Sequence, residues 1–258
     1  MSTDGYMVLQ DAVRHRLGLE LGHYKREQME RRLKAYAVQR GYGDLEGLAK
    51  AIGAEAALGG ELISYLTIHV SEFFRDPNFF SHLKELVASL PPRASRPLQA
   101  WSAGCSIGAE AYSLAMLLSE ERGEAGARIL ATDIDEKSLE RARLGVYREE
   151  ELKKVDPGRV RRYFAQEGPE FKVRDDLRRQ ITFRHHDLLR DPYPADQDII
   201  LFRNVAIYFT EEAKTQVLTG LARALTPQGL LMVGATEAIL RPADLGLRQV
   251  RPFFFARA

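Results

Sequence analysis

One stretch, LQAWSAGCSIGAEAYS at residues 98–113, constrains the fold more than any other part of this chain. Residues 98–102 have the apolar pattern of a buried strand, and residues 110–121 have the pattern of a helix. Gly104 and Gly108 lie between them, where glycine permits backbone conformations and close approaches that a Cβ atom would block. A strand that runs through a glycine turn into a helix N-terminus predicts a cradle for a nucleotide-like ligand.

A second feature of the sequence narrows the class of ligand. Asp133 ends another apolar strand, residues 128–132, and a carboxylate in that place can accept hydrogen bonds from ribose hydroxyls. The combination of a glycine turn with a later acid suits a cofactor that contains adenosine.

The turn itself is open to several interpretations. Residues 104–108, GCSIG, match the G-x-S-x-G nucleophile elbow of the α/β-hydrolases, but none of the six histidines follows the strand at residues 198–202, as the hydrolase order requires. The dinucleotide motif G-x-G-x-x-G is incomplete, because Ser106 stands at its second glycine. A methyltransferase that binds S-adenosylmethionine (SAM) tolerates such variation. An ordinary turn that binds no ligand is the remaining alternative.

Composition sets the broad class. An apolar content of 45% in 258 residues is enough for one large α/β domain and a small accessory domain. A net charge of +1 argues against a nucleic-acid binder, and no 18-residue apolar stretch indicates membrane insertion. The first residues lack the apolar region of a signal peptide, so we expect a cytoplasmic protein. Cys105, the only cysteine, excludes an internal disulfide and an all-cysteine metal site, and we expect no metal.

The first part of the chain predicts a small helical domain, with helical patterns at 8–17, 24–40, 45–52 and 58–68. Residues 14–40 hold eight Lys or Arg and three Glu, which fits either a solvated helix face or a docking surface for an acidic partner. Several prolines between residues 91 and 97 predict a linker. We therefore expect a helical domain and linker at 1–95 and an α/β domain at 96–258.

After the linker, strand and helix patterns alternate, which predicts a doubly wound, mostly parallel, Rossmann-like sheet. Residues 247–250 and 252–255 suit a closing pair of strands, one of them antiparallel. Residues 146–180 are too long and too polar for a simple connection, and we expect an inserted subdomain there, with short strands around a turn at 166–169.

Four segments in this order resemble the chemoreceptor glutamate O-methyltransferases of the CheR type: LTIHVSEFFRDPNFF, WSAGCSIGAEAYSLAM, ILATDID and LFRNVAIYF. The resemblance runs from about residue 62 to residue 255. It implies a helical N-terminal domain, a SAM-binding α/β domain and a small antiparallel β-subdomain inserted after the second helix of the α/β part.

The resemblance also implies site residues. Arg75 and Tyr208 would be catalytic, holding the acceptor or the cofactor carboxylate, with Tyr208 beside the transferred methyl group. The implied cofactor contacts are His69, Ser71, Arg75, Gly104, Glu110, Asp133, Asp187, Leu188, Arg203 and Asn204. The chain departs from the family at His69 and Ser71, where Asn and Thr are common, and also at Ala109, Ala111, Phe202 and the late motif GATE, residues 234–237, to which no catalytic role is assigned.

The implied function is SAM-dependent methylation of glutamate side chains in the cytoplasmic helical region of chemoreceptors, with S-adenosylhomocysteine as the second product and adaptation in chemotaxis as the setting. We expect a monomer. A shorter loop at residues 165–172, AQEGPEFK, predicts an enzyme that acts without binding a receptor's C-terminal pentapeptide. The alternatives are a SAM-dependent methyltransferase with another protein or a small molecule as substrate, and a non-catalytic SAM-binding signalling module.

Overall fold

The computed structural model describes residues 4–55, 57–67, 71–90, 96–123 and 125–258. The chain forms two compact units. One consists of residues 1–68 together with 206–216, and the other of residues 69–205 together with 217–258. Residues 71–90, which precede the domain boundary expected near residue 95, group with the second unit.

The first unit is helical. Its helices are α1 (Gly5–Leu17), α2 (Arg26–Gln39), α3 (Leu45–Ala54) and α4 (Leu58–Leu66), with the short 3-10 helix η1 (Leu21–His23) between the first two. Asp4 and Asp44 cap α1 and α3 by accepting hydrogen bonds from backbone N–H groups. The segment 206–216 joins this unit through η3 (Ala206–Tyr208), and Phe209 forms an isolated β-bridge with Tyr24.

The second unit is built on a seven-stranded sheet with the order β6-β2-β1-β7-β8-β10-β9. Its strands are β1 (Leu98–Ala103), β2 (Ala127–Asp133), β6 (Ile181–His185), β7 (Gln197–Phe202), β8 (Leu225–Val233), β9 (Leu247–Arg251) and β10 (Phe254–Arg257). The first five strands of that order are parallel, and β10 and β9 pair antiparallel. This arrangement confirms the fold class expected from sequence.

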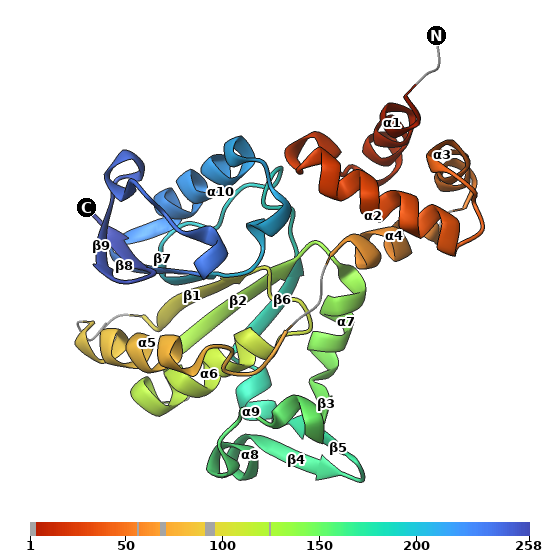
Figure 1. The fold of residues 1–258 in the computed structure, drawn as a ribbon. Coiled ribbons are helices and arrows are strands. Elements are labelled where there is room, and N and C mark those ends of the chain that lie inside the picture. The colour runs from red at the N-terminus through yellow and green to blue at the C-terminus, as the bar shows by residue number, and fades with distance from the viewer. Residues whose placement is uncertain (1–3, 56, 68–70, 91–95, 124) are drawn as a thin grey trace. The chain divides into compact units, whose positions relative to one another are not determined.

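Helices cover both faces of the sheet. They are α5 (Pro77–Ser89), α6 (Ala109–Arg122), α7 (Glu136–Leu144) and α10 (Glu211–Ala224). Two short 3-10 helices, η4 (Ala235–Glu237) and η5 (Pro242–Leu245), follow β8. Figure 1 shows α5 and α6 side by side on one face, and these two helices contact each other. Successive residues of β1 point to opposite faces of the sheet. Ala100 packs in the hydrophobic cluster with α5 and α6. Trp101 packs against Tyr193 and His186.

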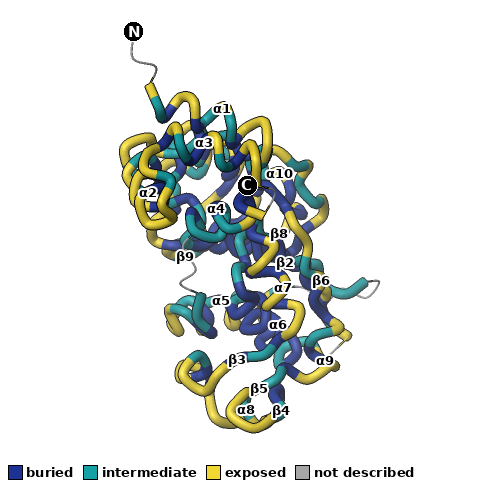
Figure 2. The backbone as a smooth tube through the Cα atoms, turned by 90° about the vertical axis from the view of Figure 1, so that its right-hand side faces the viewer, coloured by how far each residue is buried: buried dark blue, intermediate teal, exposed yellow. Residues whose placement is uncertain are grey.

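The inserted subdomain follows α7, as expected. Its antiparallel sheet has the order β3-β5-β4, from β3 (Val146–Arg148), β4 (Phe164–Glu167) and β5 (Glu170–Val173). The 3-10 helix η2 (Glu149–Leu152) and the short helices α8 (Pro157–Tyr163) and α9 (Asp175–Arg178) complete it. Figure 2 shows the central strands of the large sheet buried, whereas the hairpin of β4 and β5 is largely exposed. In the described ranges, the helices are all too short or too polar to cross a membrane.

Candidate functional site

The glycine turn lies between β1 and α6, where the sequence placed it. Gly104 has φ +90°, and a Cβ atom there would lie 2.3 Å from Cγ2 of Val205. Gly108, which caps α6, has φ +88°, and a Cβ atom there would lie 2.9 Å from that of Ala142. Both positions therefore need glycine for conformation and for space.

Asp133 is oriented by the turn. Its Oδ2 accepts a hydrogen bond from the backbone N–H of Ser106 at 2.7 Å, and its Oδ1 accepts one from Asp135 at 3.0 Å. These two bonds fix the orientation of the side chain, and a carboxylate is an acceptor suited to the two hydroxyls of a diol. This is the geometry that a ribose contact requires.

Glu110 provides a half-buried carboxylate at the first turn of α6. Ser102 donates its hydroxyl to Oε1 at 2.8 Å, and Oε2 lies 3.6 Å from Nη1 of Arg203. Burial raises the pKa of Glu110, and the positive charge of Arg203 opposes that rise. A cationic ammonium group near this carboxylate would further stabilise its ionised form, so Glu110 suits an α-amino group.

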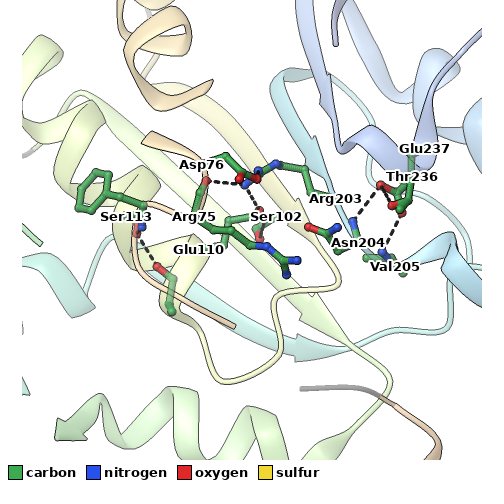
Figure 3. Close-up of polar contacts among 12 residues, drawn as sticks. Arg75, Asp76, Ser102, Glu110, Ser113, Arg203, Asn204, Val205, Thr236 and Glu237 are labelled. Atoms are coloured by element: carbon green, nitrogen blue, oxygen red, sulfur yellow. Dashed lines mark hydrogen bonds and ion pairs between the residues drawn. The ribbon is translucent and has the colours of Figure 1, made fainter. Parts of the chain in front are cut away.

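Arg203 joins Glu110 to the loop before α5. Its side chain is only 1% exposed, and its Nη1 donates to the carbonyl oxygen of Arg75 at 3.1 Å. Its Nη2 pairs with Asp76, and its guanidinium lies over the ring of Phe79 at 5.1 Å from the centroid. The Arg203 guanidinium thus joins the carboxylate of Glu110 to the backbone of the Arg75 loop (Figure 3).

The loop that carries Arg75 has a constrained backbone. Phe74 and Asp76, on either side of it, have φ of 48° and 58°, a left-handed conformation that is rare for residues other than glycine. The N–H of Phe74 donates to the buried hydroxyl of Ser113 at 2.9 Å. Contacts of this kind maintain strain at functional sites. In Figure 3 the side chains of Arg75 and Asn204 point into the space between their two loops.

Asn204 follows β7 and also has a left-handed backbone, with φ 59°. Its N–H and that of Val205 are both bound by the carboxylate of Glu237, which is fully buried. Sequence analysis gave Glu237 no role. Nothing in the sequence marks this contact, since its partners are backbone groups at the end of a distant strand.

Asp187 and Leu188 follow β6, which is the parallel neighbour of β2. Asp187 accepts from the N–H of Leu189 at 2.8 Å, and the carbonyl of Leu188 accepts from the hydroxyl of Tyr193 at 2.6 Å. The backbone N–H of His186 donates to the carbonyl of Asp133 at 3.0 Å, which brings this loop beside the acid at the end of β2. A ligand whose ribose lies on Asp133 would have its base near this loop.

The remaining predicted site residues are His69, Ser71 and Tyr208. His69 lies outside the described residues. Ser71 is half-buried just before the Arg75 loop. Tyr208 falls in the helical unit, where its carbonyl accepts from the N–H of Lys25 at 2.8 Å and its ring lies 5.6 Å from the guanidinium carbon of Arg32. Its place beside a methyl group stays a prediction.

The basic segment of the helical unit is partly neutralised. Arg32 is half-buried, donates to the carbonyl of Tyr65 and lies over the rings of Tyr65 and Tyr208. Lys34 pairs with Glu30 at 2.7 Å. Arg32 is therefore a structural residue of this unit rather than part of an open positive face.

The turn does not favour hydrolase chemistry. Burial raises the pKa of the Cys105 thiol well above its usual range, so the reactive thiolate is disfavoured. Ser106 has φ 49°, as in a strained strand-to-helix turn, but its N–H is bonded to Asp133.

Comparisons with known proteins agree with this geometry. The model for the SAM-binding domain of CheR methyltransferases matches residues 69–251, and the model for their all-alpha domain matches residues 4–67. The chain is 37% identical over 253 residues to a chemotaxis protein methyltransferase of Listeria monocytogenes, covering 98% of this chain and 97% of that protein. The protein of the same name from Listeria innocua is also 37% identical over 253 residues, with the same coverage. The protein of that name from Escherichia coli is 34% identical over 232 residues, which is 86% of this chain and 80% of that protein.

Proposed function

Because this chain belongs to the CheR methyltransferase family and has S-adenosyl-L-methionine as its cofactor, we propose that it methylates glutamate side chains in the cytoplasmic helical region of chemoreceptors. The product would be a glutamyl methyl ester, made in the course of chemotactic adaptation. The observation that carries the proposal is the network in which buried Arg203 holds Glu110 and the Arg75 loop together at the end of β7.

The described residues fit the cofactor. The glycine turn brings the backbone close to its neighbours, the carboxylate of Asp133 is oriented by the N–H of Ser106 at the end of β2, and Glu110 offers a negative charge for the amino group. We assign Asp187 and Leu188 to the adenine. Arg75 and Asn204 then lie on the side of the sulfonium and the acceptor.

When bound, SAM supplies a methyl group on a sulfonium, from which an acceptor oxygen takes it by in-line displacement, leaving S-adenosylhomocysteine. A glutamate is ionised at neutral pH, so the protein needs no general base. Its task is to align the carboxylate with the carbon–sulfur bond, and alignment of this kind accounts for large rate gains. Arg75, with Tyr208, would orient the acceptor without neutralising it fully.

The pentapeptide-independent mode is a finer part of the proposal. Glu167 pairs with Glu170, so that only Gly168 and Pro169 connect β4 and β5. A two-residue turn offers none of the longer loop against which a receptor tail could be held. This tight turn supports an enzyme that finds its receptor without that tether.

One assay tests the main proposal. The protein is incubated with methyl-labelled SAM and receptor-containing membranes, and the label is then challenged with mild alkali. We expect alkali-labile label on the receptor, because carboxylate esters hydrolyse readily, and we expect none on a receptor whose methylatable glutamates are replaced by alanine. Alkali-stable label, or label that persists on the substituted receptor, would show that the acceptor is a different group.

A further inference from the structure

The inserted subdomain reaches the glycine turn through Tyr147, the central residue of β3. Its side chain is almost completely buried, and its hydroxyl donates to the carbonyl oxygen of Ile107 at 2.6 Å. Ile107 lies within the glycine turn, directly before Gly108. The subdomain therefore contributes a hydrogen bond to the loop that cradles the cofactor.

The ring of the same tyrosine supports the Arg75 loop. It packs edge-on against Phe73, with ring centroids 4.8 Å apart and planes at 83°. Phe164 of β4 packs against Phe73 from a second side, with centroids 5.7 Å apart. Phe73 lies two residues before Arg75, so these ring contacts hold the start of the Arg75 loop against the subdomain.

Two further contacts link the subdomain to this loop. Arg159 of α8 lies over the ring of Phe74 at 4.4 Å, while its guanidinium donates two hydrogen bonds to Glu120, at 2.9 and 2.7 Å. Lys154 pairs with Glu72. The loop from Glu72 to Phe74 thus contacts the inserted subdomain residue by residue.

We propose that Tyr147 is a positioning residue for cofactor binding, fixing the glycine turn and the Arg75 loop relative to each other through its hydroxyl and its ring. The inference rests on the proposed assignment of Arg75 to the cofactor site. The turn and the loop are distant in sequence, and one buried side chain contacts both. Through this side chain, the inserted subdomain helps to hold the cofactor site in shape. Burial raises the pKa of Tyr147 well above its usual range, so its hydroxyl stays protonated and donates throughout the working range of pH.

The test compares two tyrosine-to-phenylalanine variants. Tyr147→Phe keeps the ring and removes the hydrogen bond to the turn. Tyr112→Phe is the matched control, since Tyr112 is equally buried and donates to the carbonyl of Ala142 at 2.8 Å, outside the turn. Both variants lose one buried hydrogen bond, so we expect similar losses of unfolding free energy. By calorimetry, Tyr147→Phe should weaken binding of S-adenosylhomocysteine by about five- to tenfold, and Tyr112→Phe by less than about twofold.

Equal losses of affinity in the two variants, or unchanged affinity in Tyr147→Phe, would overturn the inference and leave Tyr147 a core residue. A third variant, Phe164→Leu, removes support for Phe73 without touching the turn. It should raise KM for SAM by more than it lowers kcat, and an unchanged KM would also count against the inference. Arg75→Ala is measured in parallel. If that variant binds S-adenosylhomocysteine normally, Arg75 is not a cofactor contact and the premise of the inference is wrong. If it binds weakly while Tyr147→Phe binds normally, only the positioning role fails.

Discussion

The Oε2 atom of Glu237 accepts a hydrogen bond from the backbone N–H of Asn204 at 2.9 Å, and Oε1 accepts one from Val205 at 3.0 Å. Thr236 donates its hydroxyl to Oε2 at 2.8 Å (Figure 3). One buried carboxylate thus holds two consecutive N–H groups where β7 ends. Open α/β sheets bind ligands at that edge, so Glu237 fixes the backbone on which Asn204 depends.

Replacing this carboxylate by an amide should disturb Asn204. In Glu237→Gln, one of the two N–H donors would face an amide N–H₂ group and lose its acceptor. We expect SAM affinity to fall by about tenfold, because an unsatisfied buried donor costs about 1–3 kcal/mol. Calorimetry measures the effect, with Glu212→Gln, an exposed glutamate of α10, as the control. Wild-type affinity in Glu237→Gln would show that the carboxylate is not required for binding.

Glu110 predicts a pH dependence. Burial raises the pKa of Glu110 above the ordinary value of 4.5. The contribution of Glu110 to the free energy of unfolding is therefore fully present at low pH, and it is lost as the pH rises through the raised pKa. The ammonium and sulfonium groups of SAM favour the ionised carboxylate, so SAM affinity should rise over the same window. Both trends should vanish in Glu110→Gln and persist in Glu121→Gln, at the other end of α6. Calorimetric titrations at several pH values check this, and an identical pH profile in Glu110→Gln would contradict it.

The large elements could be predicted because their signals are local. Helix α7 carries such signals at both ends, with Asp135 accepting at its N-terminus and Gly145 in a left-handed conformation at its C-terminus. Helix α8 was not expected, since a short segment with three arginines has little helical periodicity of its own. It forms where Arg159 meets Glu120 and Phe74, and such tertiary contacts leave no local pattern.

The site could be predicted in outline only. The glycine turn and Asp133 follow from strand-end chemistry, and Arg75 and Glu110 came from the family resemblance. The roles of Arg203 and Glu237 depend on hydrogen bonds to backbone groups far away in sequence, at Arg75 and Asn204. A linear pattern cannot encode those partners, because any residue supplies the same carbonyl or N–H group.

Asp133 should contribute to the binding of SAM and of its product alike, because both carry the ribose. We expect Asp133→Ala to weaken both by about 1–3 kcal/mol, through the loss of hydrogen bonds to the hydroxyls and to the N–H of Ser106. Asp135→Ala is the control, since this buried carboxylate caps α7 and should affect stability alone. Calorimetry with both ligands distinguishes the two variants. A selective loss of SAM binding would place Asp133 near the methyl group instead of the ribose.

Arg75 and Tyr208 should affect turnover more than folding. Arg75→Ala removes a cation from the acceptor side, and Tyr208→Phe removes one hydroxyl, so melting temperatures should stay near that of the wild type. We expect kcat to fall at least about tenfold in each, the equivalent of about 1.4 kcal/mol in transition-state stabilisation. Initial rates with receptor membranes at saturating SAM measure it. Normal rates in both variants would refute the proposed acceptor site even if SAM still binds at the glycine turn.

The hairpin of the inserted subdomain gives the last prediction. A peptide that adds to a sheet needs an open edge and pockets for its side chains. Strand β4 lies at the edge of the small sheet, but its exposed end carries Gln166 and Glu167, and Gly168, with φ 63°, turns the chain directly back into β5. Titration with an isolated C-terminal pentapeptide should therefore give no saturable binding at concentrations up to about 1 mM, and deletion of the last five receptor residues should leave methylation rates unchanged. A micromolar dissociation constant corresponds to a binding free energy of about −8 kcal/mol. Such a constant, together with slower methylation of the truncated receptor, would show that the short hairpin binds the tail.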